Sequence, residues 1–259
     1  MIGRDTRRSG PMLEGALAAG LSSSGSDVVL LGVLPTPAVA ELVAGSDAAA
    51  GAVISASHNP FADNGIKLFG ADGFKLADAA EAAVEAALEE PGERPEAERL
   101  GAIAPWEEGR EAYVDSLLAR SDVDLAGLSI VVDCANGATA VTAPEVLERL
   151  GARVTAIGVT PDGVNINAGC GSTDLGLLSA TVVAAGADLG LAFDGDGDRA
   201  LAVDGAGATI DGDQILALCA LDLRARGALP GLRLVVVHQD HGRRPRDHQS
   251  TGDRRRRQP

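Results

Sequence analysis

Short apolar runs alternate with helical segments along most of this 259-residue chain, and that order is typical of an α/β fold with a mainly parallel sheet. We expect strands at 28–31, 52–54, 66–69, 128–133, 154–157, 189–193, 200–203 and 232–237. We expect helices at 11–25, 35–44, 78–90, 109–120, 143–150, 175–186 and 211–225. Two of the strands run directly into polar motifs, so they also place the candidate site.

The strand, glycine turn and helix pattern restarts after residues 91–108, which are rich in Pro, Gly and Glu and which we interpret as a linker region. We therefore expect repeated three-layer α/β domains with mixed, mainly parallel sheets. The first covers 1–108, the second 109–208, and a third starts at 209–237. Residues 238–259 carry seven Arg against three Asp. They are either a disordered basic tail or the product of a reading-frame shift, and we favour the frame shift.

Composition excludes several classes of partner. The net charge of −15 argues against nucleic acid and against an anionic membrane surface, even with the arginines at 254–257. No apolar run approaches the ~20 residues of a membrane-spanning helix. Three cysteines, an odd number, and a polar N-terminus favour a reducing cytoplasm. The oligomeric state stays open.

The segment SASHNP at 55–60 follows the expected strand 52–54. It offers the Ser57 hydroxyl beside His58, and Pro60 restricts Asn59 to an extended backbone. A serine becomes a good nucleophile when a neighbour accepts its proton or a metal polarises its partner. Taken alone, the segment is equally well an ordinary serine-rich turn.

Asp194, Asp196 and Asp198 alternate with glycine after the expected strand 189–193. Alternate residues of an extended segment point the same way, so three carboxylates converge and favour a hard cation such as Mg²⁺ or Ca²⁺. An EF-hand is excluded because Arg199 and Gly205 stand where its glycine and closing glutamate belong. The alternative is a solvated acidic turn.

The two motifs together predict phosphoryl transfer from a hydroxyl at a metal site. The chain has two lysines, Lys67 and Lys75, and both follow Ser57 within twenty positions. Lys67 is either a solvated hairpin residue or a proton-transfer group. A polar loop with Asn165 and Asn167 precedes helix 175–186, and we interpret it as a structural turn.

The chain resembles the α-D-phosphohexomutase family over residues 2–237, and within it the bacterial branch that acts on glucosamine phosphates. The specific stretches are IGRDTRRSGPMLEGAL, GVLPTPAVA, ISASHNPFADNGIKLFGADGFKL, VVDCANGA, GVTPDGVNINAGCGST and LAFDGDGDRALAVD. The SASHNP form points to the glucosamine branch, because the phosphomannomutase/phosphoglucomutase branch typically has TGSHNP. That second branch stays an alternative, as does a non-catalytic remnant that binds metal or phosphosugar.

The resemblance implies a role for each candidate site residue. Ser57 would be the phosphorylated serine, with His58, Lys67 and Arg4 as further catalytic residues. Arg199 and Asn59 would bind phosphate. One Mg²⁺ per chain would be held by Ser57, Asp194, Asp196 and Asp198.

The implied reaction converts glucosamine 6-phosphate to glucosamine 1-phosphate through a hexosamine 1,6-bisphosphate, for UDP-N-acetylglucosamine and cell-wall synthesis. The family's first strand, its sugar-reading loop and its last-domain phosphate clamp have no counterpart in this sequence. We therefore expect a mutase truncated at both ends, weakly active or inactive, with a phosphosugar as its small-molecule partner.

Overall fold

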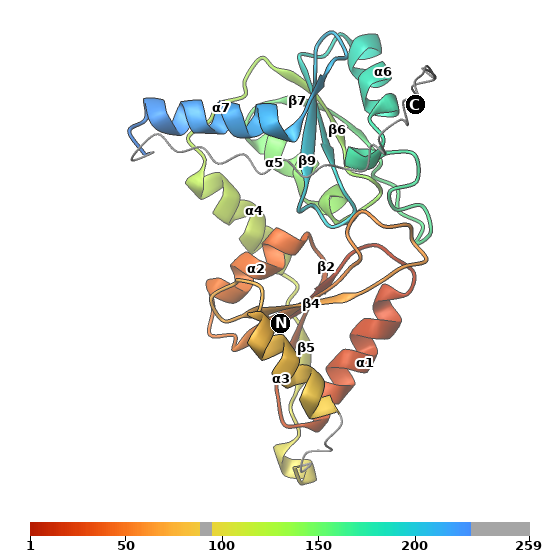
Figure 1. Cartoon of the computed structure of the whole chain (residues 1–259), viewed down its shortest axis with the longest axis vertical. Helices are drawn as coiled ribbons and strands as arrows, with labels where there is room; N and C mark the ends of the chain where they lie inside the picture. Colours follow the sequence, from red (N-terminus) through yellow and green to blue (C-terminus); the bar gives the residue numbers. More distant parts are fainter. Residues whose placement is uncertain (89–94, 229–259) are drawn as a thin grey trace, which may run out of the picture. The chain divides into compact units, whose positions relative to one another are not determined.

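The computed structural model describes residues 1–88 and 95–228 (Figure 1). Residues 1–215 form one compact unit that contains two five-stranded sheets, and a second unit begins at Leu216. The expected strand 232–237 and the basic segment 238–259 lie outside the described residues. Along the described ranges, no helix is both long and apolar enough to cross a membrane.

The first sheet has the strand order β4-β3-β1-β2-β5. Its strands are β1 (Ile2–Arg4), β2 (Val28–Val33), β3 (Ala50–Ile54), β4 (Ile66–Gly70) and β5 (Ile103–Pro105). Only the β3–β4 pairing is antiparallel among the described pairings of this sheet. The helices of this part are α1 (Gly10–Ser23), α2 (Thr36–Ala44) and α3 (Asp78–Leu88), with a short 3₁₀ turn at Ala97–Arg99.

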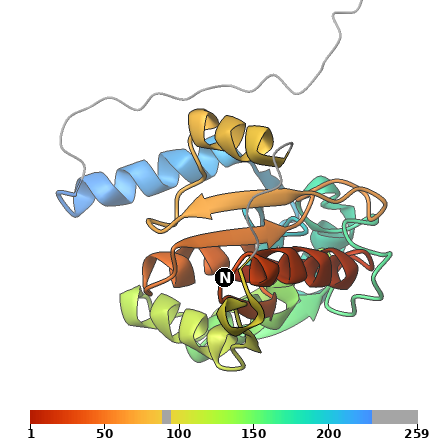
Figure 2. The same cartoon turned by 90° about the horizontal axis from the view of Figure 1, so that it is seen from below.

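Alternation along β3 explains why helices cover both faces of this sheet. Ala52 and Ile54 pack in one buried cluster with Ala18 of α1. Val53, which points to the opposite face, packs with Val39 of α2. Figure 1 shows α1 and α2 on the two sides of these strands, and Figure 2 shows the same part from below. The expected three-layer arrangement is therefore confirmed.

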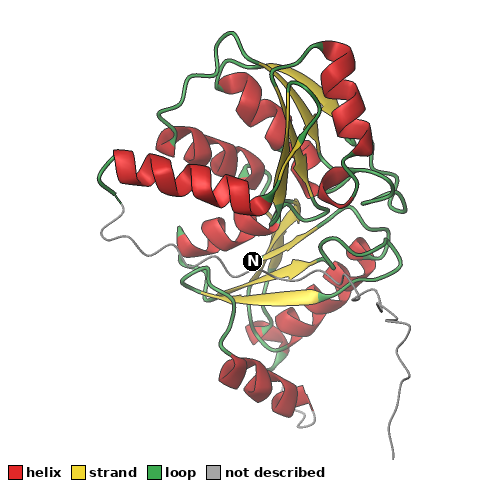
Figure 3. Ribbon diagram, turned by 45° about the horizontal axis from the view of Figure 1, so that its top comes forward, coloured by secondary structure: helices red, strands yellow, loops and turns green. Residues whose placement is uncertain are grey.

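The second sheet has the order β10-β9-β8-β6-β7. Its strands are β6 (Ser129–Asp133), β7 (Arg153–Ile157), β8 (Leu189–Phe193), β9 (Ala200–Asp204) and β10 (Thr209–Ile210). The remaining helices are α4 (Gly109–Arg120), α5 (Ala143–Arg149), α6 (Gly176–Ala185) and α7 (Gly212–Ala225), with 3₁₀ turns at Ala138–Val141 and Gly171–Thr173. β6 pairs in parallel with β7 and β8, whereas β9 is antiparallel to β8 and β10. Figure 3 distinguishes the helices, in red, from the strands, in yellow.

Two parts of the first sheet differ from the sequence-based prediction. β1 was not expected, yet it is the central strand and pairs with both β2 and β3. β5 lies inside 91–108, so the interpretation of that whole stretch as a linker was wrong. Its backbone pairs in parallel with β2 from Val28 to Leu30. β10 in the second sheet was not expected either. The other described strands and α-helices agree with the prediction to within a few residues.

Candidate active site

The loop that follows β3 presents Ser57 in an unusual backbone conformation. Its φ angle is +51°, in the left-handed region that non-glycine residues seldom adopt. Ser57 is buried, whereas the adjacent His58 side chain is exposed. The Ser57 amide donates to Ser55 Oγ at 2.9 Å. The loop therefore holds the candidate nucleophile inside the protein and turns its neighbour outward.

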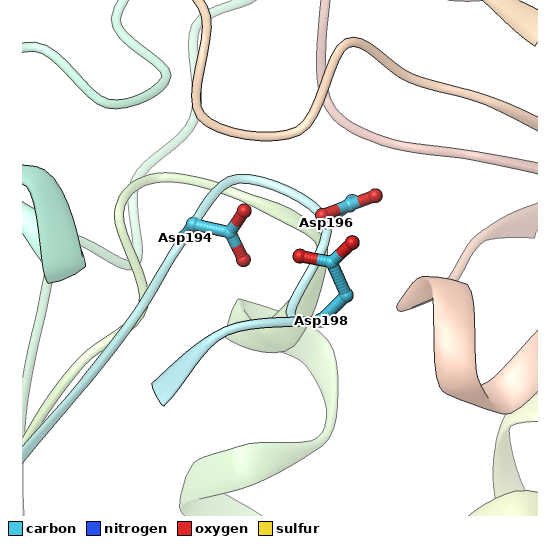
Figure 4. A group of neighbouring side chains, drawn as sticks. All are labelled: Asp194, Asp196 and Asp198. Carbon is cyan, nitrogen blue, oxygen red and sulfur yellow. The ribbon is translucent and has the colours of Figure 1, made fainter. Parts of the chain in front are cut away.

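The loop between β8 and β9 gathers the three aspartates. One carboxylate oxygen from each of Asp194, Asp196 and Asp198 lies within 4.8 Å of the others, and Figure 4 shows these side chains around one loop. Asp194 and Asp196 are fully buried. Burial, together with repulsion from its two neighbours, raises the pKa of Asp194 to about 6 although Ser57 donates a hydrogen bond to it.

The two sequence motifs meet in space. Ser57 Oγ donates to Asp194 Oδ2 at 2.5 Å and lies 3.4 Å from Asp198 Oδ1. Lys67 of β4 completes the group: its Nζ lies 2.6 Å from Asp196 Oδ2 and 3.3 Å from Asp198 Oδ2. The structure thus brings together five of the residues singled out from the sequence.

Lys67 and the aspartates stabilise one another's charged forms. Burial would lower the pKa of Lys67, but its contacts with Asp196 and Asp198 outweigh that effect and raise it. Burial would likewise raise the pKa of Asp196, but hydrogen bonds from Lys67 and from Thr36 at 2.7 Å hold it below its usual value. The proton on Lys67 is therefore held by two carboxylates, and of the two alternatives for Lys67 this contact favours a role in the site.

The other predicted residues lie around this centre without joining it. Arg4 Nε pairs with Glu14 at 3.1 Å, so its guanidinium is engaged with α1. Arg199 is half exposed and its Nε lies 3.8 Å from Asp198 Oδ1. Asn59 donates to Asp63 at 3.1 Å, and its backbone carbonyl accepts hydrogen bonds from Arg7 and Asn167.

Those neighbours, Arg7 and Asn167, were not expected at the site. Arg7 is fully buried beside fully buried Asp5, and it donates to the carbonyls of Ser57 and Asn59. Asn167 donates to the same two carbonyls from the loop that was interpreted as a structural turn. The sequence did hold one signal for Arg7. Asp5 and Arg7 are oppositely charged residues in the short segment between β1 and α1, where neither the strand nor the helix requires a charged pair.

The aspartate triad fits a divalent metal ion. Oxygen ligands of this kind suit Mg²⁺ or its neighbours rather than softer metals. In addition, Asp196 Oδ1 is buried and has no hydrogen-bond partner among the residues that the structure describes, although a buried carboxylate oxygen is normally satisfied. An ion bound among the three carboxylates would supply that missing partner.

Comparison with known proteins assigns the fold and the motifs to one family. Residues 1–95 match domain I and residues 111–207 match domain II of phosphoglucomutase/phosphomannomutase, both described as alpha/beta/alpha domains. The phosphoglucosamine mutase of Symbiobacterium thermophilum is 54% identical over 240 residues, which are 92% of this chain and 54% of that protein. The phosphoglucosamine mutase of Bacillus subtilis is 51% identical over 232 residues, 88% of this chain and 52% of that protein.

A solved structure agrees. The crystal structure of a phosphoglucomutase/phosphomannomutase family protein from Burkholderia thailandensis has a TM-score of 0.75 at 30% identity, covering 87% of this chain and 50% of its own. This chain spans about half the length of the relatives it matches. The sheet topology, the two motifs and these similarities together show that the chain belongs to the phosphoglucomutase/phosphomannomutase family, the α-D-phosphohexomutases.

Proposed function

We propose that this chain carries the phosphoryl-transferring part of a phosphoglucosamine mutase, which interconverts glucosamine 6-phosphate and glucosamine 1-phosphate. The observation that carries the proposal is the contact of the Ser57 hydroxyl with Asp194, beside Lys67 and two further carboxylates. The 51–54% identity to the two phosphoglucosamine mutases supports the choice of substrate.

The proposed reaction moves one phosphoryl group at a time. A sugar hydroxyl attacks the phosphorus of phosphorylated Ser57, the bond from phosphorus to Ser57 Oγ breaks, and a bond from phosphorus to the sugar oxygen forms. The sugar hydroxyl gives its proton to a base as Ser57 Oγ regains one. The product is a hexosamine 1,6-bisphosphate, which returns its other phosphoryl group to Ser57 after reorienting in the site.

The charges around Ser57 suit this transfer. Phosphoryl transfer is accelerated mainly by positioning and by cations that neutralise charge on the moving group. Lys67 lies beside the triad, in contact with Asp196, where its positive charge can neutralise charge on the moving group. Arg199, whose guanidinium is half exposed, is the phosphate-binding residue that we propose next to it. Arg4 is engaged by Glu14 and would have to leave it to reach a phosphate.

One Mg²⁺ per chain would be held by Asp194, Asp196, Asp198 and the phosphate of Ser57. When bound, it would supply positive charge to the transferring phosphoryl group. Among the chain's own residues, Thr36 fixes the orientation of Asp196 through a 2.7 Å hydrogen bond, and the backbone amide of Arg199 does the same for Asp194 at 3.2 Å.

The test is phosphorylation of Ser57. The purified chain is incubated with glucose 1,6-bisphosphate and Mg²⁺, and peptide mass spectrometry locates any phosphate gained. We expect one phosphoryl group on Ser57, none in Ser57→Ala, and much less in Asp196→Asn, with Asp174→Asn as the control. Asp174 lies in another loop, where it accepts from the Gly176 amide. The absence of phosphate on Ser57 in the unmodified chain would overturn the proposal.

Sugar specificity is tested separately. Once Ser57 is phosphorylated, the chain is offered glucosamine 6-phosphate, glucose 6-phosphate or mannose 6-phosphate, and loss of the phosphoryl group is followed by intact mass. Faster loss to glucosamine 6-phosphate supports the glucosamine assignment. Faster loss to either of the others would assign the chain to the second branch of the family.

A further inference from the structure

Two side chains grip the same two carbonyl groups of the Ser57 loop. Arg7 Nη2 donates to the carbonyl oxygens of Ser57 at 3.2 Å and of Asn59 at 2.6 Å. Asn167 Nδ2 donates to the same oxygens at 2.9 Å and 3.2 Å. We propose that Arg7 and Asn167 form a carbonyl clamp, a pair of positioning residues that hold Ser57 so that its hydroxyl points at the aspartates. The proposal rests on the function proposed above for Ser57.

The Arg7 side of the clamp is built into the core of the first sheet. Arg7 and Asp5 are both fully buried and form an ion pair, and leaving either charge without its partner would be costly. Asp5 also accepts the hydroxyl of Ser55 at 2.5 Å, and Ser55 Oγ accepts the Ser57 amide at 2.9 Å. Both the N–H and the C=O of Ser57 are thus anchored to one buried network.

The Asn167 side comes from the second sheet's loops, 110 residues further along the chain. Asn167 itself has φ +58°, a conformation that asparagine tolerates better than most residues. Its backbone N–H donates to the carbonyl of Ala135 at 2.9 Å. The side-chain amide nitrogen suits the clamp because the two carbonyl oxygens need donors, whereas the side chain of an aspartate would present a further acceptor.

A clamp explains how the strained conformation of Ser57 persists. A non-glycine residue with positive φ is held only where its surroundings over-determine it. Four hydrogen bonds to two carbonyls provide that restraint, and they come from both motif-bearing halves of the molecule. The position of the hydroxyl then depends on residues that touch neither the hydroxyl nor the aspartates.

The first variant is Asn167→Asp, which keeps the side-chain shape and the tolerance for positive φ but removes the donor. The matched control is Asn165→Asp in the same loop, where the lost amide donates to Thr160 instead, at 3.0 Å. The probe is glucose 1,6-bisphosphate with Mg²⁺, and the readout is the rate of Ser57 phosphorylation at varied bisphosphate concentration. We expect the maximal rate to fall about tenfold to a hundredfold, because displacing a reacting group by about 1 Å costs that much.

A residue with a merely structural role would not, when replaced, lower the maximal rate and leave the other properties of the site unchanged. The clamp predicts an unchanged half-saturating bisphosphate concentration and unchanged Mn²⁺ affinity, because the aspartates are untouched. It also predicts faster hydrogen exchange at the Ser57 amide, measured by NMR without any ligand. Arg7→Lys is a second variant in case Asn167→Asp does not fold. It keeps the buried charge but cannot span Asp5 and both carbonyls, and the control is Arg149→Lys, whose guanidinium is on the surface.

The outcomes separate the two proposals. If the unmodified chain gains no phosphate, the proposed function fails, and the exchange of the Ser57 amide still tests the clamp. If the chain is phosphorylated, and folded Asn167→Asp or Arg7→Lys matches its control in both rate and amide exchange, the clamp is refuted. A fall in Mn²⁺ affinity equal to the fall in rate would also refute it, because the variants would then act through the metal site.

Discussion

Gly195 lies between the first two aspartates of the triad, and its backbone approaches the Ser57 loop so closely that no room is left for a side chain. A Cβ added there would lie 2.7 Å from the Ser57 carbonyl oxygen, 2.7 Å from Ile166 Cδ1 and 2.8 Å from Asn167 Nδ2. Its φ is outside the left-handed region, so Gly195→Ala introduces a purely steric conflict. Ordinary contact begins at 3.4 Å, so the loops must separate by about 0.7 Å, the difference between 3.4 and 2.7 Å.

The size of the effect follows from that separation. Forcing an extra methyl group into a packed site costs about 1–3 kcal/mol. We expect the free energy of unfolding of Gly195→Ala, measured by urea denaturation, to fall by that amount. We expect Ser57 phosphorylation from glucose 1,6-bisphosphate to slow by about tenfold or more, because the hydroxyl and the carboxylates move apart.

The control is Gly15→Ala, an exposed position of α1 where an added Cβ meets nothing within 4 Å. Replacing a glycine inside a helix should raise the free energy of unfolding by about 0.5–1 kcal/mol and leave phosphorylation unchanged. The same substitution is thus expected to have opposite signs at the two positions. If Gly195→Ala is as stable and as readily phosphorylated as the unmodified chain, the close approach of the two loops is wrong.

The remaining predictions concern the core and the thiols. Leu178→Ala, at a side chain that is 0% exposed, should lower the free energy of unfolding by about 2–5 kcal/mol in urea, whereas Leu177→Ala at 50% exposure should change it little. Burial raises the pKa of Cys134 to about 12 and of Cys170 to about 11, so both stay protonated at pH 8. A thiol reagent should therefore modify one cysteine of the native chain, the exposed Cys219, and three after denaturation; two or more fast thiols in the native chain would contradict this.

The fold class and the two motifs were predictable because both depend on local patterns. Mainly apolar runs such as 128–133 and 189–193 are long enough to identify strands, and ligands collect where such strands end. β1 and β5 have three residues each, too few for a period to show. Their residues also disfavour a strand assignment. β1 contains Gly3, where a Cβ would lie 2.4 Å from Val39, and β5 is an exposed strand that ends in Pro105.

The carbonyl clamp could not be predicted for a different reason. Arg7 acts on carbonyls about fifty residues away, and Asn167 acts on the same carbonyls from 110 and 108 residues away. Every residue has a backbone carbonyl, so the sequence does not indicate which carbonyls will accept a hydrogen bond from a distant side chain. Lys67 was easier to find because it lies near Ser57 in a chain that otherwise uses arginine.

The contacts of the unphosphorylated site also predict how metal binding and phosphorylation depend on each other. The Ser57 hydroxyl now donates to Asp194, and phosphorylation removes that proton and places a dianion beside the carboxylate. Lys67 already serves two aspartates, so it cannot neutralise the added charge alone. We therefore expect the phosphorylated chain to bind Mn²⁺ at least about tenfold more tightly than the unphosphorylated chain in calorimetric titrations. By linkage, saturating Mn²⁺ must then favour phosphorylation by the same factor, so equal Mn²⁺ affinities of the two forms would show that the phosphate lies away from the aspartates.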